Sequence, residues 1–356
     1  MHILKIPYSL VATDAAAAKA IQDSSHPSSR TQRFSTAHHK RGEILPIVPE
    51  NVPHFTHTPP PWTPYGYALW HDLIAASQGL KQAEYHEILI PSFLYEDMMR
   101  CHSAWVSTGR IHGAILSEVL DTLHATKAGK RLAALLDGER KWFIRLDQMS
   151  PKDSPMGGKL PSSTLEDVVM KLCSSMRAYG CLVREKEDAE KEGREMVIRL
   201  VLNRWDEGMD PAREFRVFVP PPAAAAVSRS TNALTVENFK ISAISQYKWP
   251  LVFEVPWGFS LEETVAKVEA GADTVLADIV AYAQKELSED IVNMLLKHGL
   301  SFDVALQQDG SVQLVEINPF GALSGCGACL FNWVLDGKVL YGLGEAQFAV
   351  TLDGAV

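Results

Sequence analysis

The chain has 356 residues, of which 46% are hydrophobic and 22% charged, a composition typical of a globular protein with a sizeable core. Its net charge of −9, without any block of Lys or Arg, offers no positive field to attract nucleic acid. The sequence shows no secretory signal and no run of about 18 apolar residues, and five cysteines do not suit a disulfide framework. We therefore expect a cytoplasmic protein with neither nucleic-acid nor membrane partners.

The N-terminal segment, residues 1–64, is predicted to be irregular because Ser and Pro cluster in it, at 24–29 and again at 57–61. Apolar residues such as Ile44 indicate that part of this segment still packs on the body of the protein. A folded body is expected to begin near residue 65, where apolar residues take up helical spacing.

Residues 65–195 are predicted to form a first subdomain that is largely helical. A buried strand over 142–146 leads into a polar turn that carries Lys152. Ser163 and Glu166 have the spacing of a capping box, in which the serine side chain and the glutamate satisfy free backbone amides at a helix start.

Residues 196–345 are predicted to form a second subdomain of strands and two amphipathic helices, followed by a short tail over 346–356. Alternating or continuous apolar runs define the strands, and apolar spacing of three and four residues defines the helices. The predicted strands cover 196–203, 214–219 and 239–247, and the helices lie within 259–297.

The most informative segment is a predicted hairpin over 302–318. The dipeptide Asp309–Gly310 between two alternating runs is typical of a two-residue turn, which makes Gln308 face Ser311. Counting outward from that turn places Asp303 directly opposite Glu316. Directly opposed residues share a face of the sheet with Cβ atoms about 5 Å apart.

Asn318 shares this face because side chains alternate along a strand, so Asp303, Glu316 and Asn318 are predicted to form one patch. Two facing carboxylates repel each other, and Mg²⁺ neutralises such a pair while it binds substrate phosphates. A solvated acidic hairpin is the alternative. The apolar neighbours of the three residues favour the magnesium site.

Several other residues could bind phosphate. Arg145 ends the buried strand, and Lys152 follows it in the turn, where it is either a phosphate ligand or a solvated loop lysine. Arg216 lies in an alternating strand that suits a functional cleft or an ordinary surface, and the surface is the commoner case for an isolated strand. Gln246 is a weaker candidate.

Four segments, in order, resemble the motifs of the cell division cycle protein 123 family, which has the ATP-grasp fold. The resemblance covers roughly residues 85–335, and the motifs are specific when they are taken together. The matching segments are 143–153, 200–205 with 214–219, 244–246, and 302–304 with 316–321, and 330–333 closes the match.

The resemblance implies an α+β, ATP-grasp fold with antiparallel sheets, flanking helices and a nucleotide held between two subdomains. It also implies ATP and Mg²⁺ as ligands, with three residues on the metal and the others around the nucleotide. By this resemblance the metal ligands would be Asp303, Glu316 and Asn318, the phosphates would contact Arg145 and Arg216, and the adenine would border Leu200, Val201 and Leu202. Lys152 and Gln246 remain candidate nucleotide ligands from their positions in the sequence.

The chain departs from the family pattern at informative positions. The family usually has lysine in place of Arg145 and Asp-Phe-Asn in place of residues 316–318, where this chain has the Glu-x-Asn form common in catalytic ATP-grasp ligases. The loop after Gly321 is also longer than in the family. These departures favour an enzyme over the family's known role.

Two functions therefore compete. The first is an ATP-dependent carboxylate–amine ligase, in which a small-molecule or peptide carboxylate forms an acyl phosphate that an amine then displaces, with Lys152 and Arg216 as catalytic charges. The second is the family's role as an ATP-binding assembly chaperone of translation initiation factor 2, which binds the gamma subunit of that factor.

Cys326 and Cys329 form a lone Cys-x-x-Cys motif, which is weak evidence for zinc or for a redox pair because no second pair or thioredoxin-like pattern accompanies it. Packing of small residues beside the nucleotide is the favoured interpretation. The sequence further predicts that Asp303→Asn with Glu316→Gln abolishes Mg-ATP binding and leaves the fold intact.

Overall fold

The computed structural model describes residues 1–23, 33–37, 39, 41–44, 46, 59–224 and 238–354. The chain divides into two compact units. The large unit comprises Met1–Tyr65 and Gly208–Val356, and the small unit comprises Gly66–Glu207. Among the described helices, none combines the length and the apolar character that crossing a bilayer demands.

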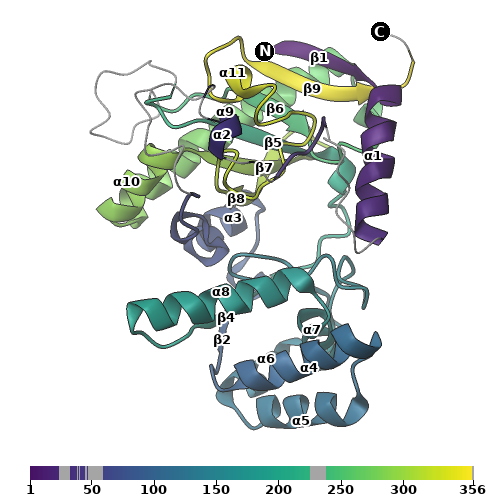
Figure 1. Cartoon of the computed structure of the whole chain (residues 1–356), viewed down its shortest axis with the longest axis vertical. Helices are drawn as coiled ribbons and strands as arrows, with labels where there is room; N and C mark the ends of the chain where they lie inside the picture. The colour runs from purple at the N-terminus through teal and green to yellow at the C-terminus, as the bar shows by residue number, and fades with distance from the viewer. Residues whose placement is uncertain are drawn as a thin grey trace. The chain divides into compact units, whose positions relative to one another are not determined.

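The large unit is built on a six-stranded mixed sheet, in the order β1-β9-β6-β5-β7-β8 (Figure 1). Strand β9 pairs in parallel with both β1 and β6, whereas the other neighbours are antiparallel. The strands are β1 (His2–Pro7), β5 (Glu214–Val219), β6 (Ala243–Gln246), β7 (Leu300–Leu306), β8 (Val312–Asn318) and β9 (Gln347–Leu352).

Helix α9 (Leu261–Glu286) packs on one face of this sheet, against β8. Its start is fixed by a capping box in which Ser260 accepts from the amide of Glu263 and the Glu263 side chain accepts from the amide of Ser260. The remaining helices of the large unit are α1 (Tyr8–Asp23), α2 (Arg41–Ile44), α10 (Glu289–His298) and α11 (Gly337–Leu340), with short 3-10 turns at Thr63–Tyr65, Pro211–Arg213 and Pro256–Gly258.

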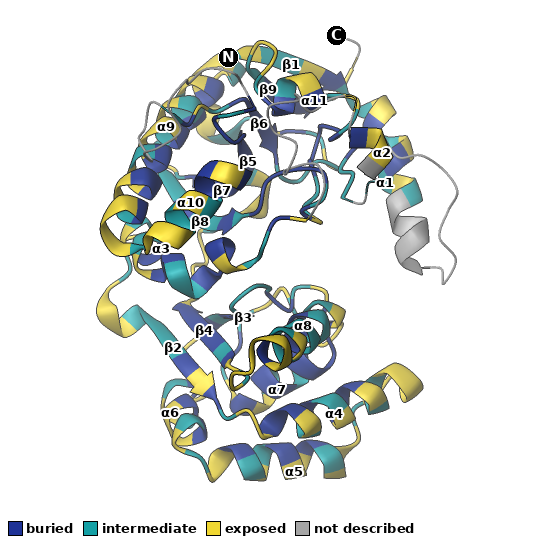
Figure 2. Ribbon diagram, turned by 60° about the vertical axis from the view of Figure 1, so that its left-hand side comes forward, coloured by how far each residue is buried: buried dark blue, intermediate teal, exposed yellow. Residues whose placement is uncertain are grey.

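The opposite face of the large sheet is covered by the chain after β8. Trp333 lies edge-on to Phe218 of β5, to Phe320 and to Tyr341, with ring centroids 5.5, 5.0 and 6.4 Å away. All four rings are buried, and Figure 2 shows that the central strands beneath them are buried as well. Polar side chains that the central strands direct to this side, such as Arg216, are therefore buried under a packed loop.

The small unit holds a three-stranded antiparallel sheet, in the order β2-β4-β3, with helices packed on one face. Alternate residues of the strands, such as Ile88, Ile144 and Leu200, join the helices in one apolar core. The elements are β2 (Tyr85–Ile90), β3 (Trp142–Leu146), β4 (Ile198–Arg204), α3 (His71–Ser77), α4 (Leu94–Thr108), α5 (Gly113–His124), α6 (Lys127–Leu135), α7 (Leu165–Cys173) and α8 (Met176–Glu192), with 3-10 turns at Tyr67–Trp70 and Gln82–Glu84.

These units differ from the subdomains predicted from the sequence. The segment 1–64, predicted to be irregular, begins with β1 and α1, although its Ser- and Pro-rich parts lie almost entirely outside the described residues. The predicted tail 346–356 contains β9, and the strand predicted to open the second subdomain is β4 of the small sheet. The reason is non-local: β1 and β9 pair in parallel from opposite ends of the chain, which no local pattern can indicate.

The capping box predicted from the sequence lies one residue before the one in the structure. The helix predicted to be capped by Ser163 and Glu166 is capped instead by Thr164, which accepts from the amide of Asp167. The Asp167 carboxylate accepts in turn from the amide of Thr164. Thr and Asp at these positions provide the same two hydrogen bonds, so both registers satisfy the motif.

Candidate metal and nucleotide site

Strands β7 and β8 form an antiparallel hairpin in which Asp303 faces Glu316, as predicted. The turn that joins them is longer than predicted. Gln307, and not Gln308, faces Ser311, and its amide donates to the Ser311 carbonyl over 2.8 Å. The loop thus has three residues and ends in the left-handed conformation, a standard variant of the Asp-Gly turn.

A bulge in β8 then restores the predicted pairing. From the turn outward, the ladder runs one residue out of the predicted register as far as the pair Val304 and Leu314. Val315 is the extra residue, and the register shifts before Asp303 is reached. The longer turn and the bulge each shift the register by one residue, and the two shifts cancel. The pairing of Asp303 with Glu316 was therefore predicted correctly, although the longer turn and the bulge were not.

Asn318 joins the two acids on the same face. Its amide nitrogen lies 3.3 Å from Oδ2 of Asp303 and 3.3 Å from Oε1 of Glu316, and it donates to both. Asp303 is only 1% exposed, whereas Glu316 and Asn318 are half-buried. The three side chains predicted to hold a metal are thus gathered on one patch, with the amide nitrogen directed at the carboxylates.

Arg216, on the neighbouring strand β5, faces Asp303 and holds it with two hydrogen bonds. Nε donates to Oδ1 over 2.8 Å and Nη2 donates to Oδ2 over 2.7 Å. The third donor, Nη1, reaches the Gly327 carbonyl over 2.9 Å. This buried bidentate pair shows that Arg216 is not a surface residue, although the alternating strand on its own more commonly indicates one.

The guanidinium of Arg216 also changes the electrostatic argument for a metal. Burial opposes its charge, but the Asp303 carboxylate outweighs this and holds the pKa of Arg216 well above its ordinary value. One of the two facing carboxylates is therefore already neutralised by the protein. The repulsion used to predict a metal does not by itself require one.

The donor set still suits a hard cation. Two carboxylates and an amide supply oxygen ligands, and one negative charge remains after Arg216 is counted against Asp303 and Glu316. Asn318 would have to turn its amide so that oxygen replaces nitrogen. Within the described residues, no group of three or more His, Cys, Asp or Glu gathers as possible metal ligands, so this patch depends on its amide and on ligand phosphates.

Tyr247 and Ser245 flank Arg216 and were missed by the sequence analysis as site residues. The Arg216 guanidinium lies 5.2 Å from the centre of the Tyr247 ring, and burial raises the pKa of the Tyr247 phenol well above its ordinary value. Ser245 pairs with Arg216 in the ladder, and its hydroxyl accepts from the amide of Leu330 over 3.0 Å. Alternation along 243–247 would have indicated both, once β6 was placed beside β5.

Gln246, which was the predicted candidate in this strand, points to the other face. It pairs with Phe215 and not with Arg216. Its amide nitrogen donates to the carbonyls of Lys248 and Leu251, and its oxygen accepts from the amide of Thr351. The Gln246 side chain therefore holds the loop after β6 and the neighbouring strand β9, and it does not join the acidic patch.

The Cys-x-x-Cys motif lies in the loop that covers the patch. Cys326 is half-buried and Cys329 is buried, and burial raises the pKa of the Cys326 thiol. Because the described residues contain no group of three His, Cys, Asp or Glu, the two thiols have no further ligands for zinc there. Their loop contributes the Gly327 carbonyl to Arg216.

In the small unit, Arg145 lies on the sheet face opposite the apolar core. It pairs with Val201, its guanidinium stacks 4.1 Å from the centre of the Tyr67 ring, and its Nε donates to the Leu146 carbonyl. Tyr67 in turn accepts from Asn203, whose side-chain oxygen lies 2.6 Å from Nε2 of His71. Arg145 is thus 5% exposed within a polar layer.

The three residues predicted to border adenine do not share a face. Leu200 and Leu202 lie fully buried in the apolar core of the small unit. Val201 alternates with them and lies on the face of Arg145. Their side chains cannot line one pocket together, so any shared role would have to come from the backbone of β4.

Lys152 follows β3 in a loop of successive hydrogen-bonded turns. The neighbouring Asp153 accepts from the hydroxyl of Ser175 over 2.5 Å and from the amide of Arg177 over 3.1 Å, which anchors the loop at the start of α8. Lys152 itself is half-buried beside this anchor.

No protein-family model matches the sequence, and none of the curated proteins matches it either. Solved structures do resemble the chain. Cdc123 from Schizosaccharomyces pombe is 17% identical, with a TM-score of 0.50, and the match covers 86% of this chain and 99% of that one. A C-terminally truncated form of the same protein gives 17% identity, a TM-score of 0.51, and coverage of 90% and 100%.

D-alanine-D-alanine ligase from Aeromonas hydrophila is 14% identical over 78% of this chain and 72% of that one, and its TM-score of 0.27 is too low to bear on the fold. The similarity to Cdc123 concerns the fold, since identity is low while coverage is nearly complete. It agrees with the α+β, ATP-grasp fold expected from the motifs. The chain has the fold of Cdc123.

Proposed function

We propose that the chain binds Mg-ATP through Asp303, Glu316 and Asn318 and uses it in an ATP-dependent carboxylate–amine ligation. The observation that carries this proposal is the convergence of two carboxylates and an amide on one sheet face beside the buried Arg216. The fold shared with Cdc123 supports it, because the motif resemblance links that fold to nucleotide binding.

Each residue of the patch has a distinct part in binding. Asp303 is held in place by Arg216 and faces Glu316, so its oxygens do not need to be ordered when a cation binds. Glu316 is the half-buried acid and supplies the second carboxylate. When bound, Mg²⁺ would neutralise phosphate charge at this patch. Arg145, by resemblance, and Lys152, by its place in the turn after β3, remain predicted phosphate ligands in the small unit.

The reaction class follows from the Glu-x-Asn form of the motif. A substrate carboxylate attacks the γ-phosphate of ATP, and ADP leaves as an acyl phosphate forms. An amine then attacks the acyl carbon, phosphate leaves, and the amine loses a proton to give the amide. Catalysis of this kind depends on positioning and charge neutralisation, which the patch and Arg216 are suited to provide.

The second candidate is an ATP-binding assembly chaperone for the gamma subunit of translation initiation factor 2. It is favoured by the match with Cdc123, which extends over 99% of that chain. In this case Mg-ATP would be bound at the same patch without turnover. The two candidates therefore share a binding site and differ in what the bound nucleotide does.

Calorimetric titration with Mg-ATP tests the binding site that the two candidate functions share. Glu316→Gln removes a half-buried carboxylate and leaves the pair of Arg216 and Asp303 intact. We expect at least about tenfold weaker binding, or about 1.4 kcal/mol. Glu345→Gln is the matched control, because Glu345 is an exposed residue before β9 and should bind like the wild type. Equal affinity in the wild type and Glu316→Gln would refute the site.

Asp303→Asn with Glu316→Gln, the pair suggested by the sequence alone, is a poor test. Asp303 is buried against Arg216, so the change weakens a buried ion pair and is expected to destabilise the fold. A loss of binding in that double variant would not distinguish a missing ligand from a damaged fold.

Turnover separates the two candidates. The purified chain is incubated with Mg-ATP and pools of carboxylates and amines, and release of ADP and phosphate is measured. Release that depends on a carboxylate and an amine supports the ligase. Nucleotide binding without turnover, together with co-purification of the initiation factor's gamma subunit, supports the chaperone and rejects the ligase.

A further inference from the structure

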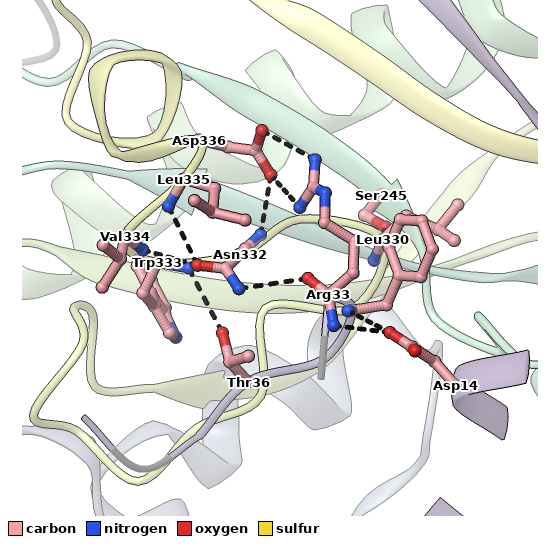
Figure 3. A network of polar contacts seen from close by, with 11 residues as sticks. Asp14, Arg33, Thr36, Ser245, Leu330, Asn332, Trp333, Val334, Leu335 and Asp336 are labelled. Atoms are coloured by element: carbon pink, nitrogen blue, oxygen red, sulfur yellow. Dashed lines mark hydrogen bonds and ion pairs between the residues drawn. The ribbon is translucent and has the colours of Figure 1, made fainter. Parts of the chain in front are cut away.

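A short N-terminal segment, Arg33–Thr36, lies across the loop Cys326–Asp336 in the large unit (Figure 3). Asp14 of α1 anchors this segment, because its carboxylate accepts from the amides of Arg33 and Phe34 over 2.5 and 2.9 Å. Phe34 is buried in the apolar cluster on that face of the sheet. The segment is therefore packed as well as hydrogen-bonded.

Arg33 ties the segment to the far end of the loop. Its guanidinium makes two hydrogen bonds with Asp336, over 2.7 and 2.9 Å, and its carbonyl accepts from the side chain of Asn332 over 3.1 Å. Asp336 also accepts from the amide of Asn332, while Thr36 accepts from the amide of Trp333 over 3.3 Å. Figure 3 shows these contacts converging from two ends of the chain.

The near end of the loop meets the same segment at Ser35. The Ser35 amide donates to the Cys329 carbonyl over 2.7 Å, and both residues have positive φ, at 51° and 54°. Such conformations cost side-chain-bearing residues energy and persist only where the surroundings enforce them. Gly327 also lies close to the segment, because a Cβ added there would be 2.7 Å from the Ser35 hydroxyl.

This contact leads directly to the acidic patch. The Gly327 carbonyl accepts from Nη1 of Arg216, and the other two donors of Arg216 hold Asp303. Each link is a close contact within the large unit: the N-terminal segment fixes the loop, the loop fixes Arg216, and Arg216 fixes Asp303.

We propose that Arg33–Thr36 is an intramolecular clasp that positions Arg216, and through it Asp303, for nucleotide binding; this rests on the proposed function. Arg33, Asn332 and Asp336 are positioning residues, since they reach the patch only through the loop. The ion pair of Arg33 and Asp336 is its accessible latch, with side-chain exposures of 38% and 20%. Opening the latch should loosen the loop first and the patch second.

The first test measures the loop without any nucleotide. Cys326 lies in the loop and is half-buried, so its reaction with a thiol reagent, followed by mass spectrometry, reports loop opening. Arg33→Ala should speed labelling of Cys326 by about fivefold, the scale of a good surface ion pair. Asp336→Asn should act similarly, and the double variant should add little to either single change.

Arg204→Ala is the matched control, because it removes an arginine from another ion pair, with Glu84 at 2.7 Å, in the small unit. It should leave the labelling of Cys326 unchanged. If Arg33→Ala labels at the wild-type rate, or if the two changes add independently, the clasp is overturned whether or not the chain binds nucleotide.

The second test is Mg-ATP affinity of the same variants. Binding to Arg33→Ala that is about fivefold weaker, with Arg204→Ala unchanged, supports positioning of the patch. Faster labelling with wild-type affinity rejects that positioning role. If the wild type itself binds no Mg-ATP, the proposed function fails and positioning for nucleotide fails with it, while the labelling rates still decide whether the latch holds the loop.

Discussion

Each unit places one buried arginine on a sheet face, and the two arginines are held in different ways. Arg216 in the large unit makes two charged hydrogen bonds with Asp303, whereas Arg145 in the small unit stacks on the ring of Tyr67. A carboxylate fixes a guanidinium in both direction and charge, while a ring fixes its plane alone. Charged residues of the same type on similar strands can therefore differ in how strongly they support the fold.

The largest expected effect comes from removing the carboxylate that holds Arg216. Asp303→Ala leaves the buried Arg216 without its partner, so the free energy of unfolding should fall by about 3–5 kcal/mol. Urea denaturation measures it. Replacing both residues, with Asp303→Leu and Arg216→Met, should recover most of the loss, since no buried charge remains. A loss below about 1 kcal/mol in Asp303→Ala would contradict the account of the pair.

The next effect concerns how α9 supports the hairpin from behind the sheet. A Cβ at Gly271 would lie 2.3 Å from a methyl carbon of Val312, so Gly271→Ala should destabilise the fold by about 1–2 kcal/mol. In a Val312→Gly background, which removes the three Val312 atoms nearest to that Cβ, the same change should become stabilising, because alanine favours a helix more than glycine does. Thermal unfolding of the four proteins measures this reversal, and destabilisation in both backgrounds would argue against the contact.

A smaller effect is expected from Arg145. Arg145→Met keeps an apolar side chain over Tyr67 and loses the cation–π contact, so stability should fall by about 1–2 kcal/mol in urea. Arg216→Met alone should cost more, because it leaves a buried carboxylate unpaired. Equal losses in the two variants would remove the difference drawn between the two arginines.

The smallest effect is a pH dependence beside Arg145. Burial lowers the pKa of His71, and the hydrogen bond to Asn203 opposes this only in part. The unfolded chain, with a histidine pKa of about 6.5, then binds the proton more readily, so His71 weakens the fold as pH falls below that value. NMR titration of His71 should show the lowered pKa, and His71→Gln should flatten this part of the pH profile of stability. A raised pKa of His71 would contradict this prediction, because His71 would then stabilise the fold as pH falls.

The sequence could predict the acidic patch because its elements are local. Alternation and the Asp-Gly turn placed Asp303 opposite Glu316, and the bulge at Val315 restored a register that the longer turn had shifted. A single bulge cannot be placed from a mixed polar and apolar run such as 312–317, so only a structure reveals that two offsets cancel. The motif resemblance likewise indicated the fold, which the match with Cdc123 bears out.

Contacts between residues far apart in the chain could not be predicted from the sequence. The partner of Arg216 is 87 residues away, and nothing in the alternating strand 214–219 distinguishes an arginine that faces Asp303 from one that faces solvent. Gln246 was named as a candidate and Ser245 was not, because the pairing of β6 with β5 was unknown and the sequence did not show which residues of β6 share the face of Arg216. The strand β1 and the segment Arg33–Thr36 also fold against distant parts of the chain.

The central claim is that Asp303, Glu316 and Asn318 form a metal and nucleotide site. A crystal structure with Mn²⁺ and a non-hydrolysable ATP analogue tests it most directly, because anomalous scattering locates the manganese. We predict a manganese ion bound by oxygens of Glu316 and Asp303, with the amide oxygen of Asn318 turned toward it. Manganese and nucleotide bound elsewhere, with the Asn318 amide still donating to both acids, would contradict the account.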